Sequence, residues 1–281
     1  MEKALLNKII PFSNVDGPGN RMAIFFQGCS FSCLYCHNPE TISLCNNCGD
    51  CIKTCPVKAL NLINNKVVWN EDKCINCDTC LKTCKNLSSP KVKEVDVDYL
   101  FNRIKEVKPY IRGITVSGGE CTLYSKFLEE LFIKVKNELN LTCLIDSNGS
   151  IDFEKNLKSL IDISDGVMLD VKAINNDFHR EITSRSNEIV IKNLKYLLKI
   201  NKLEEVRTVC LPNFTKNNEE TVKEISKIIK NNTRYKLIKY RYFGVRKEGL
   251  NKFNKVITLD EEINRLEKIA NENGCFNIIK I

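Results

Sequence analysis

The chain has 281 residues, of which 43% are hydrophobic and 28% charged, a composition that excludes a disordered chain and predicts a globular protein with one main core. No run approaches the roughly 18 apolar residues that a membrane span needs, and the first eight residues lack the apolar region of a signal peptide, so we expect a cytoplasmic protein without membrane contact. The net charge of +8 is spread over the polar sides of predicted helices, which favours a solvated surface over a nucleic-acid groove.

The fifteen cysteines are the unusual feature of the composition. An odd number in a chain without a secretory signal argues against a disulfide framework and favours metal ligation. Eleven of them lie between Cys29 and Cys84, so the first third of the chain is expected to carry the metal chemistry. The other four have no partner at ligand spacing and are expected to be small core residues. They are Cys121, Cys143, Cys210 and Cys275.

Apolar periodicity predicts alternating strands and helices along most of the chain. The first predicted strand delivers the chain into a loop that contains cysteines. Residues 43–89 break the alternation with two cysteine-dense repeats punctuated by proline, which indicates an inserted module. From Val97 onward, helix and strand alternate again to the C-terminus. The predicted strands are residues 21–27, 113–116, 141–145, 167–171, 206–211 and 236–242.

Strands that alternate with helices imply parallel pairing through right-handed crossovers. Six such units predict an α/β fold, a partial (β/α)6 barrel similar to a TIM barrel. We expect residues 1–42 and 90–281 to form this barrel and residues 43–89 to form the insert. In such a fold, ligands bind at the carboxyl ends of the parallel strands.

The loop after the first strand carries three cysteines in the spacing Cys29-x3-Cys33-x2-Cys36. Three thiolates bound to a cubane of four irons leave one iron without a protein ligand, and that iron can bind a substrate. A structural zinc site completed by His37 is the alternative, but this spacing directly after a buried strand fits zinc ribbons poorly. The triplet therefore predicts an iron–sulfur cluster with an open coordination position.

The insert carries two runs of four cysteines in the spacing of bacterial two-cluster ferredoxins, in which the fourth cysteine of each run binds the other cluster. The first run is followed by Pro56, as in that pattern, whereas the second lacks the proline. A ferredoxin-type module with two [4Fe-4S] clusters either relays electrons to the first cluster or only holds a short segment folded, and the relay is the favoured interpretation. One cluster would be bound by Cys45, Cys48, Cys51 and Cys84, and the other by Cys74, Cys77, Cys80 and Cys55.

Three polar segments follow predicted strands. In the first, Ser117-Gly118-Gly119-Glu120, glycine lets the backbone approach a ligand closely, although a plain turn needs glycine too. Residues 146–149 and 170–172 place two carboxylates and one ammonium where a zwitterionic ligand can be held. The alternative for both is a helix cap or surface charge.

Five motifs occur in a fixed order along the chain: Asp16-Gly-Pro-Gly19, Phe26-Gln-Gly-Cys29, Cys33-Leu-Tyr-Cys36-His-Asn38, Ser117-Gly-Gly-Glu120 and Asp170-Val-Lys172. With them the chain resembles the glycyl-radical-enzyme activating proteins of the radical SAM superfamily, from about residue 9 to about residue 215. The insert resembles the subgroup of these activases that carries two ferredoxin-type clusters. Residues 240–246 are similar to the YjjW-type activases.

This resemblance implies three [4Fe-4S] clusters and S-adenosylmethionine, which is cleaved reductively to a 5′-deoxyadenosyl radical. The radical takes a hydrogen from a glycine Cα of a partner glycyl radical enzyme, and a flavodoxin or ferredoxin-type protein donates the electron. Asp16 would meet the partner's glycine loop, Tyr35 would pack near the adenine, and Gly119 with its neighbours would hold the methionyl amino group. The implied cofactor-binding residues are Tyr35, Cys36, His37, Gly118, Gly119, Glu120, Asp146, Asp170, Val171 and Lys172.

The resemblance also bears on three further features. Asp146, Asp170 and the carbonyl of Met168 match a monovalent-cation site of relatives. Phe243 stands where some activases have a histidine that contacts the cofactor's ribose. His179 matches a family position, and a surface histidine on a helix is the equal alternative.

Two other classes of function share part of the pattern. A radical SAM enzyme that modifies RNA or a small molecule needs the same first cluster, but no clustered stripe of aromatic and arginine residues predicts an RNA groove. A ferredoxin-like electron carrier explains the insert, but it needs neither the cysteine triplet nor the alternating strands and helices that follow. The activase is therefore the favoured interpretation.

Overall fold

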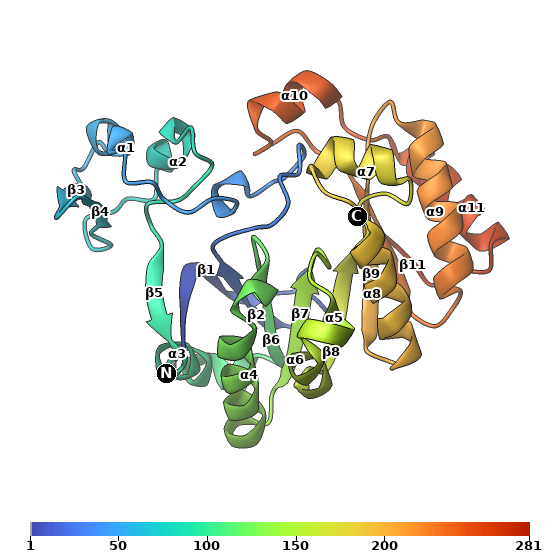
Figure 1. Ribbon diagram of the computed structural model, residues 1–281, viewed down its shortest axis with the longest axis horizontal. Helices are drawn as coiled ribbons and strands as arrows, with labels where there is room; N and C mark the ends of the chain where they lie inside the picture. Colours follow the sequence, from blue (N-terminus) through green and yellow to red (C-terminus); the bar gives the residue numbers. More distant parts are fainter. Residues whose placement is uncertain (1) are drawn as a thin grey trace.

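A nine-stranded sheet forms the centre of the protein in the computed structural model, which describes residues 2–281 (Figure 1). The strand order is β11-β10-β9-β8-β7-β6-β2-β1-β5. Neighbours from β2 to β11 pair in parallel, whereas β1 is antiparallel to β2 and β5. The fold is thus α/β with a mostly parallel central sheet. Its strands are β1 (Lys3–Ser13), β2 (Arg21–Phe26), β5 (Lys93–Asp96), β6 (Gly113–Gly118), β7 (Thr142–Ser147), β8 (Gly166–Asp170), β9 (Leu203–Cys210), β10 (Arg234–Lys239) and β11 (Ile278–Lys280).

Helices connect the successive parallel strands. Neighbouring helices pack on one another along the sheet, α3 on α4, α4 on α6 and α9 on α11. The longer helices are α3 (Val97–Val107), α4 (Ser125–Lys134), α6 (Lys158–Ile163), α7 (Asn176–Thr183), α8 (Glu188–Lys199), α9 (Thr215–Ile229), α10 (Lys247–Phe253) and α11 (Asp260–Glu272). Shorter turns of helix are η1 (Pro39–Thr41), η2 (Lys108–Tyr110), η3 (Cys121–Tyr124), η4 (Val135–Leu139) and α5 (Phe153–Asn156).

The six predicted strands correspond to β2 and to β6 through β10. Strands β1, β5 and β11 were not predicted, because none carries a clear apolar pattern. Strand β1 alternates irregularly between buried and exposed residues, β5 has a single buried residue, and β11 is three residues long. These strands form because they pair with neighbouring strands at the edges of the sheet, and not because of a local sequence preference.

The core lies between the sheet and its helices. All six residues of β2 are buried, as expected for a parallel strand covered on both faces. Helix α3 begins after Asp96, whose carboxylate accepts a hydrogen bond from the N–H of Tyr99 at 2.8 Å. The helix then buries Leu100 and Ile104, which lie one turn apart on the same face.

Arg21 ties the first three parallel strands together at their amino ends. Its guanidinium is 2% exposed and donates to the hydroxyl of Thr115 at 2.8 Å, to the carbonyl of Ile114 at 2.6 Å and to the carbonyl of Thr142 at 3.0 Å. Burial lowers the pKa of Arg21, and these acceptors compensate its buried positive charge.

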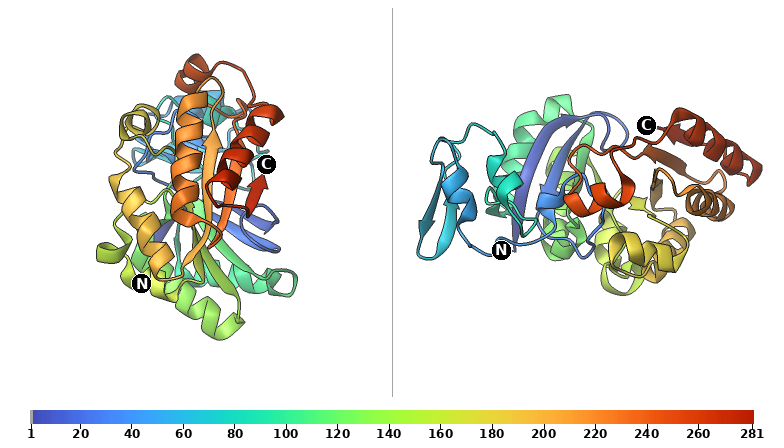
Figure 2. Two further views of the ribbon diagram at one scale, coloured as in Figure 1. Left: turned by 90° about the vertical axis from the view of Figure 1, so that its right-hand side faces the viewer. Right: turned by 90° about the horizontal axis from the view of Figure 1, so that it is seen from above.

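The insert lies at one end of the molecule, opposite α11 (Figure 2, right). It consists of α1 (Asp50–Thr54), the hairpin of β3 (Leu60–Ile63) and β4 (Lys66–Trp69), and α2 (Thr79–Thr83). Thr54 and Thr83 hold equivalent positions in the two repeats, and their hydroxyls are hydrogen-bonded to each other at 3.0 Å. Strand β5 leads the chain back to the sheet beside β1. Within residues 2–281, no helix has the length and apolar character of a membrane span.

Gly113 and Gly166 offer a matched test of the parallel packing. A Cβ on Gly113 would lie 2.2 Å from the carbonyl oxygen of Thr142 in the paired strand β7, whereas a Cβ on Gly166 would come no closer than 3.0 Å to Glu204. A paired carbonyl cannot move without breaking the ladder, so we expect Gly113→Ala to lower the free energy of unfolding by about 3 kcal/mol and Gly166→Ala by less than about 1 kcal/mol. Urea unfolding followed by circular dichroism measures both values. Equal losses would contradict the packing.

Candidate functional site

The cysteine loop begins where β2 ends, and backbone hydrogen bonds hold it on two sides. On one side, the N–H of Cys29 donates to the carbonyl of Ile42 at 2.9 Å. On the other side, the N–H of Leu34 donates to the carbonyl of Ile182 in α7 at 2.9 Å. The loop therefore has a fixed position at the carboxyl end of the parallel sheet.

The three cysteines of this loop are free thiols. Burial raises the pKa of Cys29 and of Cys33 to about 12 each, and it also raises the pKa of Cys36. The thiols therefore keep their protons until a metal displaces them. Asn148, in the turn after β7, donates its side-chain amide to Cys29 Sγ at 3.4 Å. Three soft sulfur donors, one of them already hydrogen-bonded, fit an iron–sulfur cluster.

No three Cys, His, Asp or Glu side chains converge around one point in the described part of the chain, as they would around a single metal ion. A cubane takes each thiolate on a different iron, so its ligands need no common point. The four cysteines outside the loop and the insert, Cys121, Cys143, Cys210 and Cys275, are buried, as predicted for core residues. Three of them, Cys121, Cys143 and Cys210, lie in the turn after β6, in β7 and in β9.

Glu120 links the ends of β6 and β7. Its carboxylate accepts hydrogen bonds from the hydroxyl of Thr122 at 2.6 Å, from the hydroxyl of Ser147 at 2.8 Å and from the N–H of Asn148 at 2.8 Å. Burial raises the pKa of Glu120, and these donors oppose the rise. Gly118, with a φ of +114°, turns the chain into this arrangement. Glu120 thus joins the two strand ends through these hydrogen bonds.

Charged side chains at neighbouring strand ends form close ion pairs. Asp170 Oδ2 lies 2.5 Å from Lys172 Nζ, and Asp146 Oδ2 lies 2.9 Å from Arg207 Nη1. Burial would lower the pKa of Lys172, but Asp170 raises it above its ordinary value. Burial raises the pKa of Asp146, and Arg207 opposes this. Val171 packs its side chain in the core, so Asp170 and Lys172 are the polar groups of this segment.

Arg207 and Glu205 are site residues that sequence reasoning missed. They lie two residues apart on β9 and therefore share one face of the sheet. Arg207 Nε donates to Glu205 Oε1 at 2.6 Å, and Lys236 Nζ of β10 lies 2.8 Å from the same oxygen. Glu205 is 1% exposed, so its charge depends on these cations. The sequence did carry a signal for them, because Glu205 and Arg207 are two charged residues at strand spacing inside an apolar run.

Tyr35 and His37 continue the cysteine loop. The ring of Tyr35 is buried, and Lys172 Nζ lies 5.9 Å from its centroid. The Tyr35 hydroxyl is buried without a hydrogen-bond partner among residues 2–281, which leaves a donor that a ligand can satisfy. His37 Nε2 lies 2.8 Å from the carbonyl oxygen of Arg241, so this histidine ties the loop to the segment after β10.

Asp16 precedes β2 and therefore lies beyond its amino end, whereas the cysteines follow its carboxyl end. Its carboxylate accepts a hydrogen bond from the hydroxyl of Ser13 at 2.5 Å, and its carbonyl accepts one from the hydroxyl of Thr115 in β6 at 2.5 Å. The pKa of Asp146, raised first by burial, is raised further by Asp170 and Asp16.

The segment after β10 covers the cysteine loop, which sequence reasoning also missed. Arg246 Nη2 donates to the carbonyl of Ser32 at 2.6 Å. A Cβ on Gly249 of α10 would lie 1.9 Å from the carbonyl oxygen of Leu34, so helix and loop are in direct backbone contact. Phe243, in the same segment, is 64% exposed.

His179 is buried, so the surface alternative for this residue is wrong. Its Nδ1 lies 2.7 Å from the carbonyl oxygen of Arg185, and its ring packs edge-to-face on Phe31 with 5.4 Å between centroids. Burial lowers the pKa of His179. His179 is buried because it lies on the face of α7 that packs against the cysteine loop, where Phe31 lies.

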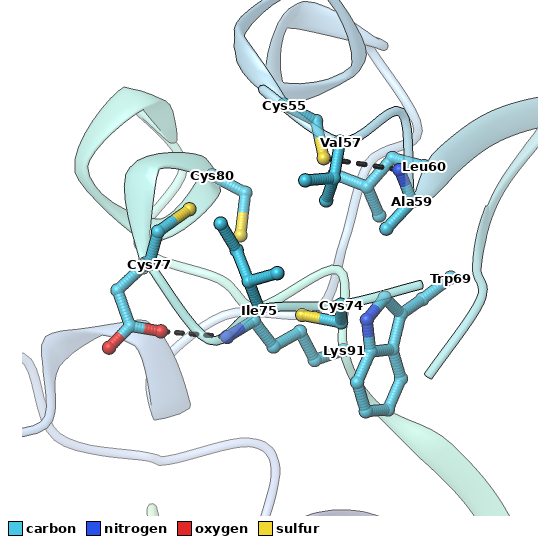
Figure 3. Close-up of a pocket in the computed structure, with 11 residues that line it drawn as sticks. Cys55, Val57, Ala59, Leu60, Trp69, Cys74, Ile75, Cys77, Cys80 and Lys91 are labelled. Atoms are coloured by element: carbon cyan, nitrogen blue, oxygen red, sulfur yellow. Dashed lines mark hydrogen bonds and ion pairs between the residues drawn. The ribbon is translucent and has the colours of Figure 1, made fainter. Parts of the chain in front are cut away.

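Two small cavities lie in the insert, one of about 20 Å³ and the other of about 10 Å³. Figure 3 shows the first, which we name the Cys74 cavity, with cysteines from both repeats around it. The second is named the Cys45 cavity. In each, three cysteines come from one run and the fourth from the end of the other. The Cys74 cavity is lined by Cys55, Cys74, Cys77 and Cys80, and the Cys45 cavity by Cys45, Cys48, Cys51 and Cys84.

Comparison with known proteins gives similarity over nearly the whole chain. The family model of the radical SAM superfamily matches residues 23–229. A Haemophilus influenzae protein named as a glycyl-radical enzyme activating enzyme is 32% identical, over 98% of this chain and 96% of its own. A pyruvate formate-lyase-activating enzyme of Staphylococcus aureus is 29% identical, over 88% of this chain and 85% of its own.

Solved structures support the fold alone. SuiB from Streptococcus suis superposes with a TM-score of 0.57 at 15% identity, over 91% of this chain and 47% of its own. QueE from Escherichia coli superposes with a TM-score of 0.53 at 12% identity, over 99% of this chain and 94% of its own.

Cys77 and Cys33 should differ strongly in reactivity in the metal-free protein. Cys77 is exposed, and the hydroxyl of Thr79, 3.4 Å from its sulfur, lowers its pKa. Burial raises the pKa of Cys33 to about 12. Because thiolate is the nucleophile, iodoacetamide at pH 8 should modify Cys77 at least about tenfold faster than Cys33, as measured by timed peptide mass spectrometry.

The equivalent exposed residue Cys48 is the internal control for this measurement. Thr79→Val removes the hydroxyl and should bring the rate at Cys77 close to that at Cys48. Modification of Cys33 ahead of Cys77 would contradict the burial of the cysteine loop.

Proposed function

The chain belongs to the radical SAM superfamily and to its glycyl-radical-enzyme activating enzymes, and from this premise we propose that it cleaves S-adenosylmethionine reductively and takes a hydrogen atom from a glycine of a partner glycyl radical enzyme. The observation that carries the proposal is that three free thiols lie in one loop at the carboxyl end of the sheet, where Asp146 and Asp170 form ion pairs at the ends of β7 and β8. A [4Fe-4S] cluster bound by the three thiolates supplies the electron and an open iron.

The residues beside the loop suit a ligand that carries both an ammonium and a carboxylate. Lys172 is a half-buried cation for the carboxylate, and Asp170 is a half-buried anion for the ammonium. A ligand carboxylate can replace Asp170 at Lys172, and a ligand ammonium can replace Lys172 at Asp170. The Tyr35 hydroxyl provides a donor in the same place. Burial of these groups excludes water, which strengthens their electrostatic interactions.

We also propose that Asp146, Asp170 and the carbonyl of Met168 hold a monovalent cation when S-adenosylmethionine is bound. Two carboxylates and a carbonyl are hard oxygen ligands, which suit such an ion. In the present structure the two carboxylates face Arg207 and Lys172, so the ion would share them with protein cations.

Asp16 is the residue proposed to meet the partner's glycine loop. It lies before the amino end of β2, whereas the cysteine loop follows the carboxyl end of that strand. Phe12, near the end of β1, and Val15, in the connection between β1 and β2, are 52% and 70% exposed. An exposed apolar pair beside a carboxylate suits a peptide that brings both side chains and backbone N–H groups.

The insert is proposed to hold two further [4Fe-4S] clusters, so that residues 43–89 form a ferredoxin-like module on a partial (β/α)6 barrel of residues 1–42 and 90–281. The crossed cysteine sets of the two cavities support this proposal. The module would relay electrons from a flavodoxin or ferredoxin-type donor. All fifteen cysteines are free, which suits the reducing cytoplasm, the location that we propose.

Iron content tests the three cluster sites. Protein reconstituted with iron and sulfide without oxygen should bind about twelve irons, four in each cubane. Replacement of Cys29, Cys33 and Cys36 by alanine should remove about four irons and leave about eight, because the insert is a separate set of ligands. Cys275→Ala, in the core, is the control and should change nothing. Stoichiometric zinc with about eight irons would contradict the first site.

The reaction itself is tested with the partner enzyme, S-adenosylmethionine and a reductant. We expect 5′-deoxyadenosine and a persistent glycine radical, whose paramagnetic resonance doublet collapses when the glycine Cα is deuterated, since that splitting comes from the remaining hydrogen. Asp16→Ala should lower the radical yield about tenfold, roughly 1.4 kcal/mol, and spare slow uncoupled cleavage. The exposed neighbour Asn14→Ala should leave the yield unchanged. Deuterium transferred instead from RNA or a small molecule into 5′-deoxyadenosine would overturn the activase function.

A further inference from the structure

The two cavities of the insert have equivalent ligand sets. Cys51 and Cys80, which come from the two short helices, are each 8% exposed. Cys48 and Cys77 are both exposed. Exposure of the ligands to solvent, one of the properties that set the reduction potential of a cluster, is therefore matched between the cavities.

The charges that line the cavities are not matched. The Cys45 cavity has Asp50 and no lysine or arginine among its lining residues. The Cys74 cavity has Asp78 and also Lys91, whose side chain is only 13% exposed and whose Nζ lies 2.7 Å from Asp78 Oδ1. The formal charges of Asp78 and Lys91 cancel, so the Cys74 cavity is more positive by one charge.

The two cavities also differ in hydrogen-bond donors. Trp69, the one tryptophan of the sequence, lies at the end of β4 and lines the Cys74 cavity. Its indole Nε1 is buried and has no hydrogen-bond partner within residues 2–281. Figure 3 shows this nitrogen on the side of the ring that faces Cys74. An indole N–H can only donate, and a buried donor is nearly always paired, so a sulfur of a cluster bound in the cavity would satisfy it.

We propose that Lys91 and Trp69 raise the reduction potential of the cluster bound in the Cys74 cavity above that of the cluster bound in the Cys45 cavity, so that an electron entering the insert rests in the Cys74 cavity first. This inference rests on the proposed function of the insert. Reduction adds one electron and no proton to a cluster, and the reduced, more negative form is stabilised by a nearby cation and by N–H donors to sulfur.

The test is a redox titration of the full chain, reconstituted with iron and sulfide and followed by electron paramagnetic resonance. Alanine at Cys29, Cys33 and Cys36 leaves the insert as the source of the signals. We expect two midpoint potentials. Lys91→Gln should lower the equilibrium constant for reduction of the cluster with the higher potential about tenfold, which lowers that potential by ~59 mV for one electron. Trp69→Phe, which keeps the ring and removes the N–H, should lower the same constant about threefold. Neither variant should move the lower potential.

Lys93→Gln is the matched control, because Lys93 lies over the Trp69 ring, 5.5 Å from its centroid, and does not line the Cys74 cavity. It removes the same charge and should shift the higher potential by less than Lys91→Gln. Fluorescence of Trp69 gives a second readout and should be quenched when the insert takes up iron. About eight irons with a single shared potential, or an equal shift from Lys91→Gln and Lys93→Gln, would overturn this inference alone. An insert that binds no iron would overturn it together with the proposed ferredoxin-like module.

Discussion

The site depends on one close backbone approach, between the end of β6 and the start of the cysteine loop. The N–H of Gly119 donates to the carbonyl of Phe26 at 2.9 Å, and the N–H of Glu120 donates to the carbonyl of Gly28 at 2.8 Å. A Cβ on Gly119 would lie 2.2 Å from the Gly28 carbonyl oxygen, so the approach requires glycine. Cys29 follows directly, and its position relative to the sheet is therefore set by backbone hydrogen bonds.

The charges at the strand ends depend on this same rigid frame. Carboxylates that are partly or fully buried need cations or donors to compensate them, and here Asp146, Asp170 and Glu205 each have a protein cation within 3 Å. Such a compensated network can exchange a protein partner for a ligand group at small cost, because the total charge is unchanged. The segment after β10 closes over the loop through Arg246 and Gly249, which keeps the network away from bulk water.

Sequence alone predicted what local pattern encodes. The parallel strands β2 and β6 to β10 have apolar runs, and each was predicted within a few residues of its bounds. The crossed cysteine sets follow from ligand spacing and stay a prediction, although each set lines one cavity of the insert. Strand β5 was missed because its pairing with β1 joins residues about 90 positions apart. The cover by α10 was missed for a related reason, because a glycine against a distant carbonyl leaves no periodic signal in the chain. Arg207 was missed although its spacing from Glu205 was a signal, because Asp146, with which it pairs, lies on another strand.

The most direct test of the central claim is whether S-adenosylmethionine binds an open iron held by the cysteine loop. Electron–nuclear double resonance of the reduced protein with S-adenosylmethionine, labelled with ¹⁵N in its methionyl amino group and ¹⁷O in its carboxylate, reports contact with the cluster. We expect hyperfine coupling from both labels, and none after alanine replaces Cys29, Cys33 and Cys36. Coupling from neither label in the reconstituted wild-type protein would contradict the assignment of this loop.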